Sequence, residues 1–369
     1  MVSSRFLNGV KCATMEGVTH HLNEAEEETE MNITTIGLDL AKNVFHIVGL
    51  DEHGHEKMKK RLSRRQVLKH FAQCPACVIG MEACASSHYF ARELRQLGHT
   101  AKLIPPQYVK AYSRGQKNDT NDARAIAEAV RVPSMRFVAV KTVAQQDLQA
   151  LIRLREGAIN ARTAGANRVR GLLGEYGLVT GKSLGALHRA LPLILEDASN
   201  GLTEVFRRLL NQQRQHLLEL DAHIAMLTAE LTALSKQDDR VGRLQTVPGY
   251  GPIVASVFAS VMGDGAQYRR GREASASLGL VPRQHGSGGK NVLLGISKRG
   301  DRYLRSLLIH GARAVVYAAR KKDDPLSRWI NRRRETRGMN KATVALANKL
   351  ARIGWAILRH GTTYQPAPA

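Results

Sequence analysis

Four acidic residues lie at the ends of predicted strands or on one face of a predicted helix, where the fold could bring their carboxylates together. Asp39 and Glu82 each end an apolar run typical of a buried strand, and Asp119 and Asp122 lie three residues apart, on one face of a predicted helix. Such carboxylates, gathered at one sheet edge, would repel one another and raise each other's pKa. Two Mg²⁺ or Mn²⁺ ions would remove that conflict and, in phosphoryl transfer, activate a nucleophile and stabilise the leaving oxygen. Each residue alone is equally consistent with a turn or cap, so the prediction depends on their conjunction.

The elements that must position these carboxylates occur in an order typical of one α/β arrangement. The predicted strands cover residues 33–39, 44–50, 55–62, 78–82 and 100–104, and the predicted helices cover 64–72 (capped by Ser63), 87–97, 107–112 and 119–131. Three meandering strands followed by alternation predict an RNase H-like (RuvC-like) sheet. In that sheet the first strand is central and the fourth lies beside it, so Asp39 and Glu82 end neighbouring strands.

A related fold gives a competing interpretation. Actin-like and sugar-kinase ATPases share the opening meander, and the segment Gly37-Leu-Asp39-Leu-Ala41 weakly resembles their first phosphate loop. Those enzymes require a second such loop and a second copy of the sheet. The helical middle of this chain supplies neither, which favours the RNase H-like interpretation.

The charge balance indicates a polyanionic partner. Among 369 residues, 55 are Lys or Arg and 32 are Asp or Glu, a net charge of +23. A surplus of this size favours contact with many phosphates, so DNA or RNA is the expected partner. The hydrophobic content of 43% is enough for folded cores, and the length suits two domains. A ribosome-associated or chromatin-packing protein would fit the charge equally well.

The cysteines and the apolar runs bear on the compartment. No run reaches the roughly 18 apolar residues of a membrane span, and no leader pattern opens the chain, so we expect a soluble, cytoplasmic protein without a membrane partner. Four cysteines fit a reducing compartment. Cys74 and Cys77 have metal-ligand spacing, but no second pair follows, which favours thiols beside a strand over a zinc site.

Composition divides the chain into five segments. Residues 1–31 are acidic between Glu24 and Glu30 and are expected to be a poorly ordered extension, with Met31 as an alternative start. The α/β domain is expected over 32–140, a helical arm over 141–240, a mainly α-helical C-terminal domain over 241–360, and a tail over 361–369.

The arm is predicted from two long helical patterns. The first covers residues 144–173, and the second covers 206–234, where eight of nine positions spaced alternately four and three apart are apolar. This spacing is a heptad seam, typical of a coiled coil. The seam has two possible partners, the 144–173 helix of the same chain or another copy of the chain.

Glycine-rich turns organise the C-terminal domain. The segment Pro248-Gly249-Tyr-Gly251 is typical of a helix–hairpin–helix turn, whose backbone N–H groups suit a DNA phosphate, although such turns also occur without that role. Residues 280–290 form a glycine-rich stretch, predicted to be flexible, with one serine among its glycines. A helix is predicted over 302–320, and the segment that follows is strongly basic.

Together these motifs resemble one family. Gly37-Leu-Asp39, Met81-Glu82 and Lys117-Asn-Asp119-Thr-Asn-Asp122 are similar to the DEDD metal motif of the insertion-sequence transposases that also include the Piv DNA invertase. The C-terminal matches are Pro248-Gly-Tyr-Gly251, Leu278-Gly-Leu-Val-Pro-Arg283, Gly286-Ser-Gly-Gly-Lys290, Ile296-Ser-Lys-Arg-Gly300 and Tyr303-Leu-Arg305. The resemblance covers about residues 32–360.

The resemblance implies a RuvC-like domain, a coiled-coil arm and a C-terminal transposase domain in a bacterial protein that is nucleoid-associated when it acts. It implies that Ser287 attacks DNA to form a covalent phosphoserine, with metal ions held by Asp39, Glu82, Asp119 and Asp122. It also implies a structured bridge RNA that pairs with donor and target DNA, and dimers that assemble into tetramers. Ser297 is the rival nucleophile, with helix capping as its alternative role.

Basic residues near the serine are the expected phosphate contacts. Together with Gly249 and Gly251, they complete the predicted nucleic-acid interface: Arg283, Lys290, Lys298, Arg299 and Arg305. Two alternatives to an RNA-guided recombinase remain open at this point. One is a RuvC-like nuclease or junction resolvase that works by hydrolysis, and the other is a non-catalytic nucleic-acid-binding protein with structural carboxylates.

Overall fold

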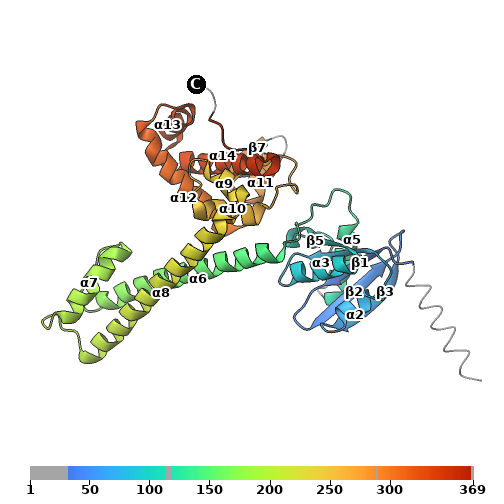
Figure 1. The fold of residues 1–369 in the computed structure, drawn as a ribbon, viewed down its shortest axis with the longest axis horizontal. Coiled ribbons are helices and arrows are strands. Elements are labelled where there is room, and N and C mark those ends of the chain that lie inside the picture. Colours follow the sequence, from blue (N-terminus) through green and yellow to red (C-terminus); the bar gives the residue numbers. More distant parts are fainter. Residues whose placement is uncertain (1–31, 114–117, 288–289, 367–369) are drawn as a thin grey trace, which may run out of the picture. The chain divides into compact units, whose positions relative to one another are not determined.

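The computed structural model describes residues 32–113, 118–287 and 290–366, and for Ser287, Lys290 and Asn291 only the backbone (Figure 1). The chain divides into two compact units, the first ending at Thr142 and the second beginning at Val143. The expected extension over residues 1–31 lies outside the described residues.

The first unit is built on a five-stranded mixed sheet. Its strands are β1 (Thr35–Asp39), β2 (Val44–Leu50), β3 (Glu56–Ser63), β4 (Val78–Glu82) and β5 (Thr100–Ile104), in the order β3-β2-β1-β4-β5. The first three strands are antiparallel neighbours, whereas β4 and β5 run parallel to β1. The expected mixed α/β domain with β1 at its centre and β4 beside it is confirmed.

Helices cover both faces of this sheet. They are α2 (Val67–Phe71), α3 (Ser87–Gln96), α4 (Pro106–Val109) and α5 (Asp119–Val130). Side chains of α2 and α3 share one apolar core with Leu38, Phe45 and Met81, while α5 packs on the opposite face. The predicted 64–72 helix is shortened to α2, and the Ser63 hydroxyl donates to the Gln66 side-chain oxygen at 2.7 Å instead of capping a helix.

Two long antiparallel helices open the second unit. They are α6 (Val143–Gly174) and α8 (Glu204–Lys236), joined through α7 (Leu184–Glu196). The antiparallel pairing follows from two contacts, Arg155 to Thr228 at 2.7 Å and Arg162 to Asp221 at 2.6 Å. Five positions of the predicted heptad are buried in α8, whereas Leu234 of the same seam is exposed and Ser235, outside it, is buried. The buried heptad positions are Leu210, Leu217, Ile224, Leu227 and Leu231. The structure places α8 beside α6 of the same chain (Figure 1).

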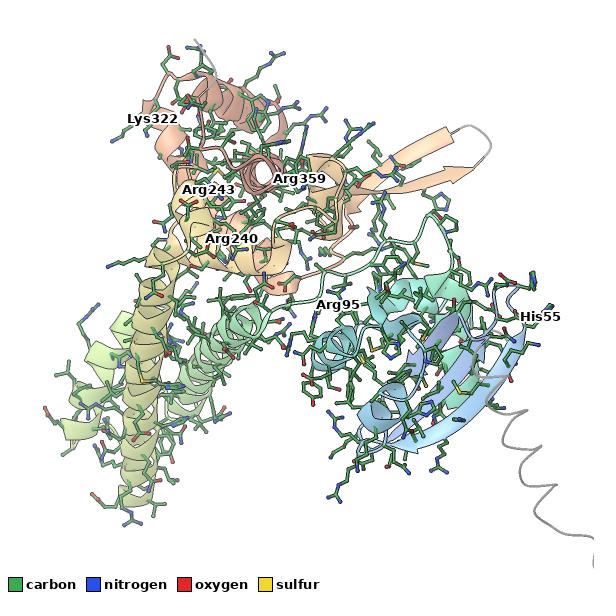
Figure 2. All side chains as sticks on the ribbon, turned by 45° about the vertical axis from the view of Figure 1, so that its right-hand side comes forward. His55, Arg95, Arg240, Arg243, Lys322 and Arg359 are labelled. Atoms are coloured by element: carbon green, nitrogen blue, oxygen red, sulfur yellow. The ribbon has the colours of Figure 1, made fainter. Side chains whose placement is uncertain are left out.

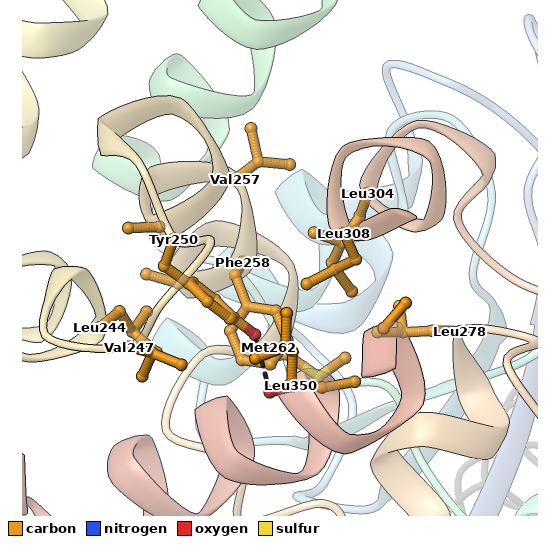
Figure 3. Close-up of a cluster of buried hydrophobic side chains, with 14 of the residues drawn as sticks. Leu244, Val247, Tyr250, Val257, Phe258, Met262, Leu278, Leu304, Leu308 and Leu350 are labelled. Atoms are coloured by element: carbon orange, nitrogen blue, oxygen red, sulfur yellow. Dashed lines mark hydrogen bonds between the residues drawn. The ribbon is translucent and has the colours of Figure 1, made fainter. Parts of the chain in front are cut away.

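The remaining elements form a mainly helical bundle. They are α9 (Asp239–Gln245), α10 (Pro252–Met262), α11 (Gly271–Ser277), β6 (Pro282–Ser287), β7 (Lys290–Ile296), α12 (Arg302–Ala318), a 3₁₀ turn η1 (Ala319–Lys321), α13 (Pro325–Arg337) and α14 (Met339–His360). Figure 3 shows their core, where the Tyr250 hydroxyl donates to the Leu350 carbonyl at 3.1 Å. Among the described helices, none is long and apolar enough to cross a membrane.

The β6–β7 hairpin corrects the prediction of a flexible stretch over residues 280–290 for its described part, while residues 288–289 lie outside the described residues. Pro282 pairs with Ile296, Gln284 with Leu293, and Ser287 with Lys290. The apolar run that starts at Val292 provides one strand, and pairing with it organises residues 282–287. Glycine content alone favours a flexible loop, whereas the neighbouring apolar run supplies a partner strand.

Candidate functional site

Strand alternation places Asp39 and Glu82 on the face of the sheet that α5 covers. Gly37 and Gly80 are register partners on β1 and β4, and each carboxylate follows its glycine by two residues. Because side chains two residues apart point to the same face, both carboxylates share the face of the glycine pair. Both also lie at the carboxyl ends of their parallel strands.

The glycine pair lets α5 lie directly against these strands. A Cβ atom at Gly37 would stand 2.0 Å from the carbonyl oxygen of Ala123, and one at Gly80 would stand 2.8 Å from the Cβ of Val130. No larger residue fits at Gly37 unless the helix backbone moves. The close approach therefore fixes where α5 begins, and with it the position of the two remaining carboxylates.

The start of α5 is set by its cap. The Asn118 side chain accepts a hydrogen bond from the Asn121 backbone N–H at 2.7 Å, which satisfies one of the donors at the helix end. Asp119 and Asp122 follow in the first turn. The positive end of the helix dipole favours negative charge at these positions.

Electrostatic coupling joins the four carboxylates. The pKa of Asp39 is raised to about 6, first by burial and then by the negative charges of Asp122, Asp119 and Glu82. The same field reaches the Cys84 thiol, whose pKa is raised to about 11 by burial, Glu82 and Asp39. The structure therefore gathers the four predicted residues into one region of concentrated negative charge.

Two further side chains border this region that the sequence did not single out. His46 is the register partner of Asp39 across β1 and β2, and its Nδ1 lies 3.6 Å from an oxygen of Asp119. The Ser113 hydroxyl donates to Asp122 at 3.2 Å. Once β2 is paired with β1, the alternation of residues 44–50 would have indicated His46.

The donor set has the chemistry of a divalent-cation site. Carboxylate oxygens are the ligands that Mg²⁺ and Mn²⁺ prefer, and the mutual repulsion at Asp39 is what a cation relieves. Nevertheless, among the described residues no three acidic, histidine or cysteine side chains already surround one point as ligands would. The charge and donor type fit, whereas the side-chain geometry is not that of a closed ligand shell.

In the second unit, the candidate nucleophiles lie in and after the β6–β7 hairpin. The Ser287 backbone ends β6, but the side chains of Ser287 and Lys290 lie outside the described part of the chain. Ser297 is not the helix cap that we expected. Asp301 caps α12 by accepting from the Leu304 N–H at 2.8 Å, and the Ser297 hydroxyl is buried with no partner among the described residues.

The loop after β7 packs tightly against the loop before β6. The Lys298 N–H donates to the Gly279 carbonyl at 3.1 Å, and the Ser297 N–H donates to the Val281 carbonyl at 2.8 Å. Gly300 has a φ of +73°, and a Cβ there would stand 1.8 Å from the Ser277 carbonyl oxygen. Two motifs distant in sequence thus form one backbone-bonded platform beneath the hairpin.

Arg305 is a correction among the predicted phosphate contacts. It is buried, and its guanidinium donates to the carbonyls of Leu278 at 3.0 Å and Arg299 at 2.8 Å. These bonds hold the platform together, and burial keeps the cation away from a phosphate. By contrast, the side chains of Arg283, Lys298 and Arg299 are exposed.

The two glycines of the Pro-Gly-Tyr-Gly turn have different roles. Gly249 has a φ of +89° and meets Gly311 of α12, where a Cβ on Gly311 would stand 2.2 Å from the Gly249 carbonyl oxygen. This glycine is needed for packing. Gly251 precedes the first residue of α10, and a Cβ there would meet nothing within 4 Å, so its backbone remains open to a ligand.

The basic side chains fall into two groups, some of which Figure 2 labels. Arg95 donates to the Ala101 carbonyl at 3.0 Å, and Arg240 pairs with Asp238 at 2.7 Å, so both serve the fold. Lys322 and Arg359 are exposed. The number of Lys and Arg residues therefore overstates the number of cations available to a polyanion.

Comparisons with known proteins identify relatives of both units. A family model for DEDD-type IS110 transposases matches residues 36–177, and one described as the transposase IS116/IS110/IS902 family matches residues 241–326. The probable family 20 transposase of Pseudomonas aeruginosa is 49% identical over 91% of this chain and all of its own length. The transposase for insertion sequence element IS1111A of Coxiella burnetii is 46% identical over 90% of this chain and 92% of its own. The transposase for insertion sequence element IS1328 of Yersinia enterocolitica is 40% identical over 90% of this chain and 99% of its own.

Proposed function

This chain belongs to the IS116/IS110/IS902 family of insertion-sequence transposases, and from that premise we propose that Asp39, Glu82, Asp119 and Asp122 form its metal-dependent centre for DNA strand cleavage. The observation that carries the proposal is the convergence of the four carboxylates, from the carboxyl ends of β1 and β4 and from the first turn of α5, close enough that Asp122, Asp119 and Glu82 all act on Asp39. Burial and these three carboxylates raise the pKa of Asp39, a conflict that a bound divalent cation would relieve.

The protein's own groups have definable tasks at this centre. The four carboxylates would hold the ions, and side-chain rotation at the sheet edge would bring their oxygens together. When bound, divalent ions supply Lewis acidity to the scissile phosphate and lower the pKa of a coordinated hydroxyl. His46 would orient Asp119, and the Ser113 hydroxyl would orient Asp122 through the bond it already donates.

We further propose that a serine hydroxyl of the second unit is the nucleophile. The Oγ–phosphorus bond forms as the phosphorus bond to the leaving sugar oxygen breaks, and the hydroxyl proton passes to that oxygen. Ser287 is favoured by its place in a Gly-Ser-Gly-Gly segment, where the backbone can approach DNA closely. Ser297 remains the rival, because its hydroxyl is buried without a partner among the described residues.

Guidance by a bridge RNA and assembly into dimers and tetramers belong to the same proposal. They are supported by the resemblance of the motifs and by the net charge of +23. Purification from a host that carries the gene with its flanking DNA, followed by sequencing of the bound RNA, tests the guide. One discrete RNA from the adjacent non-coding region is expected, whereas heterogeneous cellular RNA would contradict guidance.

A hydrolytic nuclease is the alternative, and one observation favours it. All four carboxylates belong to the first unit, so hydrolysis would need no residue from the second. A protein–DNA adduct trapped with the wild type and lost in Ser287→Ala supports the covalent route. Cleavage without any adduct, undiminished in both Ser287→Ala and Ser297→Ala, would establish the hydrolytic route instead.

The metal centre itself is tested by Asp119→Asn, with Asp147→Asn as the matched control. Asp147 is an exposed acidic residue of α6 that contributes to no carboxylate cluster described above. We expect Asp119→Asn to lower Mg²⁺-dependent cleavage at least a hundredfold, because electrostatic stabilisation of the reacting phosphate is lost. The control should cleave like the wild type. Intact cleavage in Asp119→Asn would remove this residue from the centre.

A further inference from the structure

The second unit contains a cavity of about 840 Å³ that neither the carboxylates nor the serine segment lines. It lies between α6, the start of α10 and α12. The lining residues that matter below are Arg155, Glu156, Ile253, Val254, Arg302 and Tyr303. Cavities of this size bind small organic ligands or single chemical units of a polymer.

Two guanidinium groups line the cavity, and they are held differently. Arg155 is half-buried, and it donates to Thr228 at 2.7 Å and to the Tyr303 hydroxyl at 3.2 Å, so its position is fixed by α8 and α12. Arg302 is exposed and has no hydrogen-bond or ion-pair partner in the described part of the chain. Glu156 is the one acidic residue of the lining, so the cavity is net cationic.

The same cavity also has an apolar surface. Ile253 and Val254 of α10 and Leu307 of α12 line it and are only half-buried. The backbone adds polar donors beside them, because α10 begins at Pro252 and no side chain caps its first turn. An apolar surface next to cations and backbone donors suits a ligand with a flat apolar face and an attached anion.

We propose that this cavity binds one unpaired nucleotide of a nucleic acid, with the base on the apolar surface and a neighbouring phosphate on Arg302 and Arg155. The inference rests on the proposed function, since it takes a nucleic acid to be the substrate. An unpaired nucleotide is required, because the faces of a base in a duplex are stacked on its neighbours. The strand that supplies the nucleotide is DNA or RNA.

The test is binding of labelled oligonucleotides to the full chain in EDTA, where no cleavage occurs, measured by fluorescence anisotropy. The probes are a 20-nucleotide oligothymidine, an oligouridine of equal length, an abasic oligonucleotide of equal length and a duplex. The main variants are Ser306→Glu and Ser306→Gln, which differ only in charge at an exposed position of the cavity lining. Arg302→Ala is compared with Arg208→Ala, an exposed arginine of α8 outside the cavity.

For oligothymidine or oligouridine we expect binding about tenfold weaker in Ser306→Glu than in Ser306→Gln, and about tenfold weaker in Arg302→Ala than in Arg208→Ala. The slope of the logarithm of the binding constant against the logarithm of the salt concentration should be smaller in magnitude by about one in Arg302→Ala. These differences should shrink for the abasic probe and the duplex. Tighter binding of oligothymidine assigns the nucleotide to DNA, and tighter binding of oligouridine assigns it to RNA.

Equal affinity of the two Ser306 variants for both single strands would overturn the inference. The inference would also be overturned if Ser306→Glu and Arg302→Ala weakened binding of the intact and the abasic oligonucleotides equally. The cavity would then bind the sugar-phosphate backbone alone. Both outcomes are independent of the metal centre, whose test requires Mg²⁺ and residues of the first unit. A transposase whose Asp119→Asn variant loses cleavage while both Ser306 variants bind alike would retain the proposed function without this nucleotide site.

Discussion

The two units build their candidate sites in opposite ways. The first unit uses regular elements: strand ends and a helix start place four carboxylates, and a glycine pair brings the helix down onto the strands. The second unit uses loops and a hairpin, held by backbone hydrogen bonds and by the buried Arg305 guanidinium. A site on regular elements follows from periodicity, whereas a site on loops depends on contacts between segments distant in sequence.

The comparison also separates two uses of glycine. In the first unit, Gly37 and Gly80 are needed because a helix backbone passes too close for a Cβ. In the second unit, Gly279 and Gly300 combine close approach with positive φ, at +69° and +73°. Substitution of a glycine therefore displaces a helix in the first unit and strains a loop in the second. The two defects are expected to differ in the stability lost and in the segment affected.

The largest effect is expected for Gly37→Val. Because even a Cβ at this position would lie 2.0 Å from the Ala123 carbonyl oxygen, α5 must move away from β1. We expect the first unit to lose about 3 kcal/mol of unfolding free energy or more, measured by chemical denaturation. Gly157→Ala, at a helical glycine with open space around it, is the control and should be neutral or slightly stabilising. Equal stability of Gly37→Val and the wild type would show that α5 does not depend on the glycine.

The next effect concerns the metal and requires no activity. Mg²⁺ at a hundred times its dissociation constant should stabilise the wild type by about 2.7 kcal/mol, visible as a rise in melting temperature. Asp39→Asn should abolish most of this rise and, by removing a carboxylate whose pKa is raised, should make the metal-free protein more stable at pH 7. Asp147→Asn should respond to Mg²⁺ like the wild type. An unchanged response in Asp39→Asn would contradict the ligand assignment.

A smaller effect is expected for Gly300→Ala. The backbone at a φ of +73° and the approach to Ser277 disfavour any side chain, at a cost of about 1–3 kcal/mol. The strain should be local to the 297–300 loop, so hydrogen exchange should rise at the N–H groups of Ser297 and Lys298 while α5 remains protected. Gly295→Ala, where a Cβ would meet nothing within 4 Å, is the control. Unaltered exchange in the 297–300 loop would refute the strain argument.

The smallest effect is a pH dependence in the first unit. The pKa of His88 is lowered to about 4 by burial, Lys141 and Arg92, so stability is complete above pH 6.5 and is lost as the pH falls toward 4. His88→Gln should remove that loss, a difference of about 1–2 kcal/mol between pH 7 and pH 4.5. The raised pKa of Asp39 acts in the opposite direction over this window, but it is present in both proteins and cancels. Parallel pH profiles of the two proteins would exclude His88 as the cause.

The sequence was sufficient where apolar runs and strand periodicity decide the outcome. The bounds predicted for β2, β4 and β5 agree with the structure, and the carboxylates at the ends of β1 and β4 lie on neighbouring strands as expected. The local pattern of apolar residues specifies such strands, because the residues that a strand buries lie within its own short run of sequence. The heptad spacing of residues 206–234 was an equally direct consequence of residue order.

Tertiary structure alone decided the rest. The sequence could not show that Arg305 is buried under backbone carbonyls, that Asp301 and not Ser297 caps α12, or that His46 lies beside Asp119. Nor could it show that the glycine-rich stretch pairs with the following apolar run as a hairpin. Each of these depends on which distant segment supplies a hydrogen-bond partner or excludes water. The role of a polar group is set by its neighbours in space. Local sequence patterns do not reveal those neighbours, because they come from segments that meet only when the chain folds.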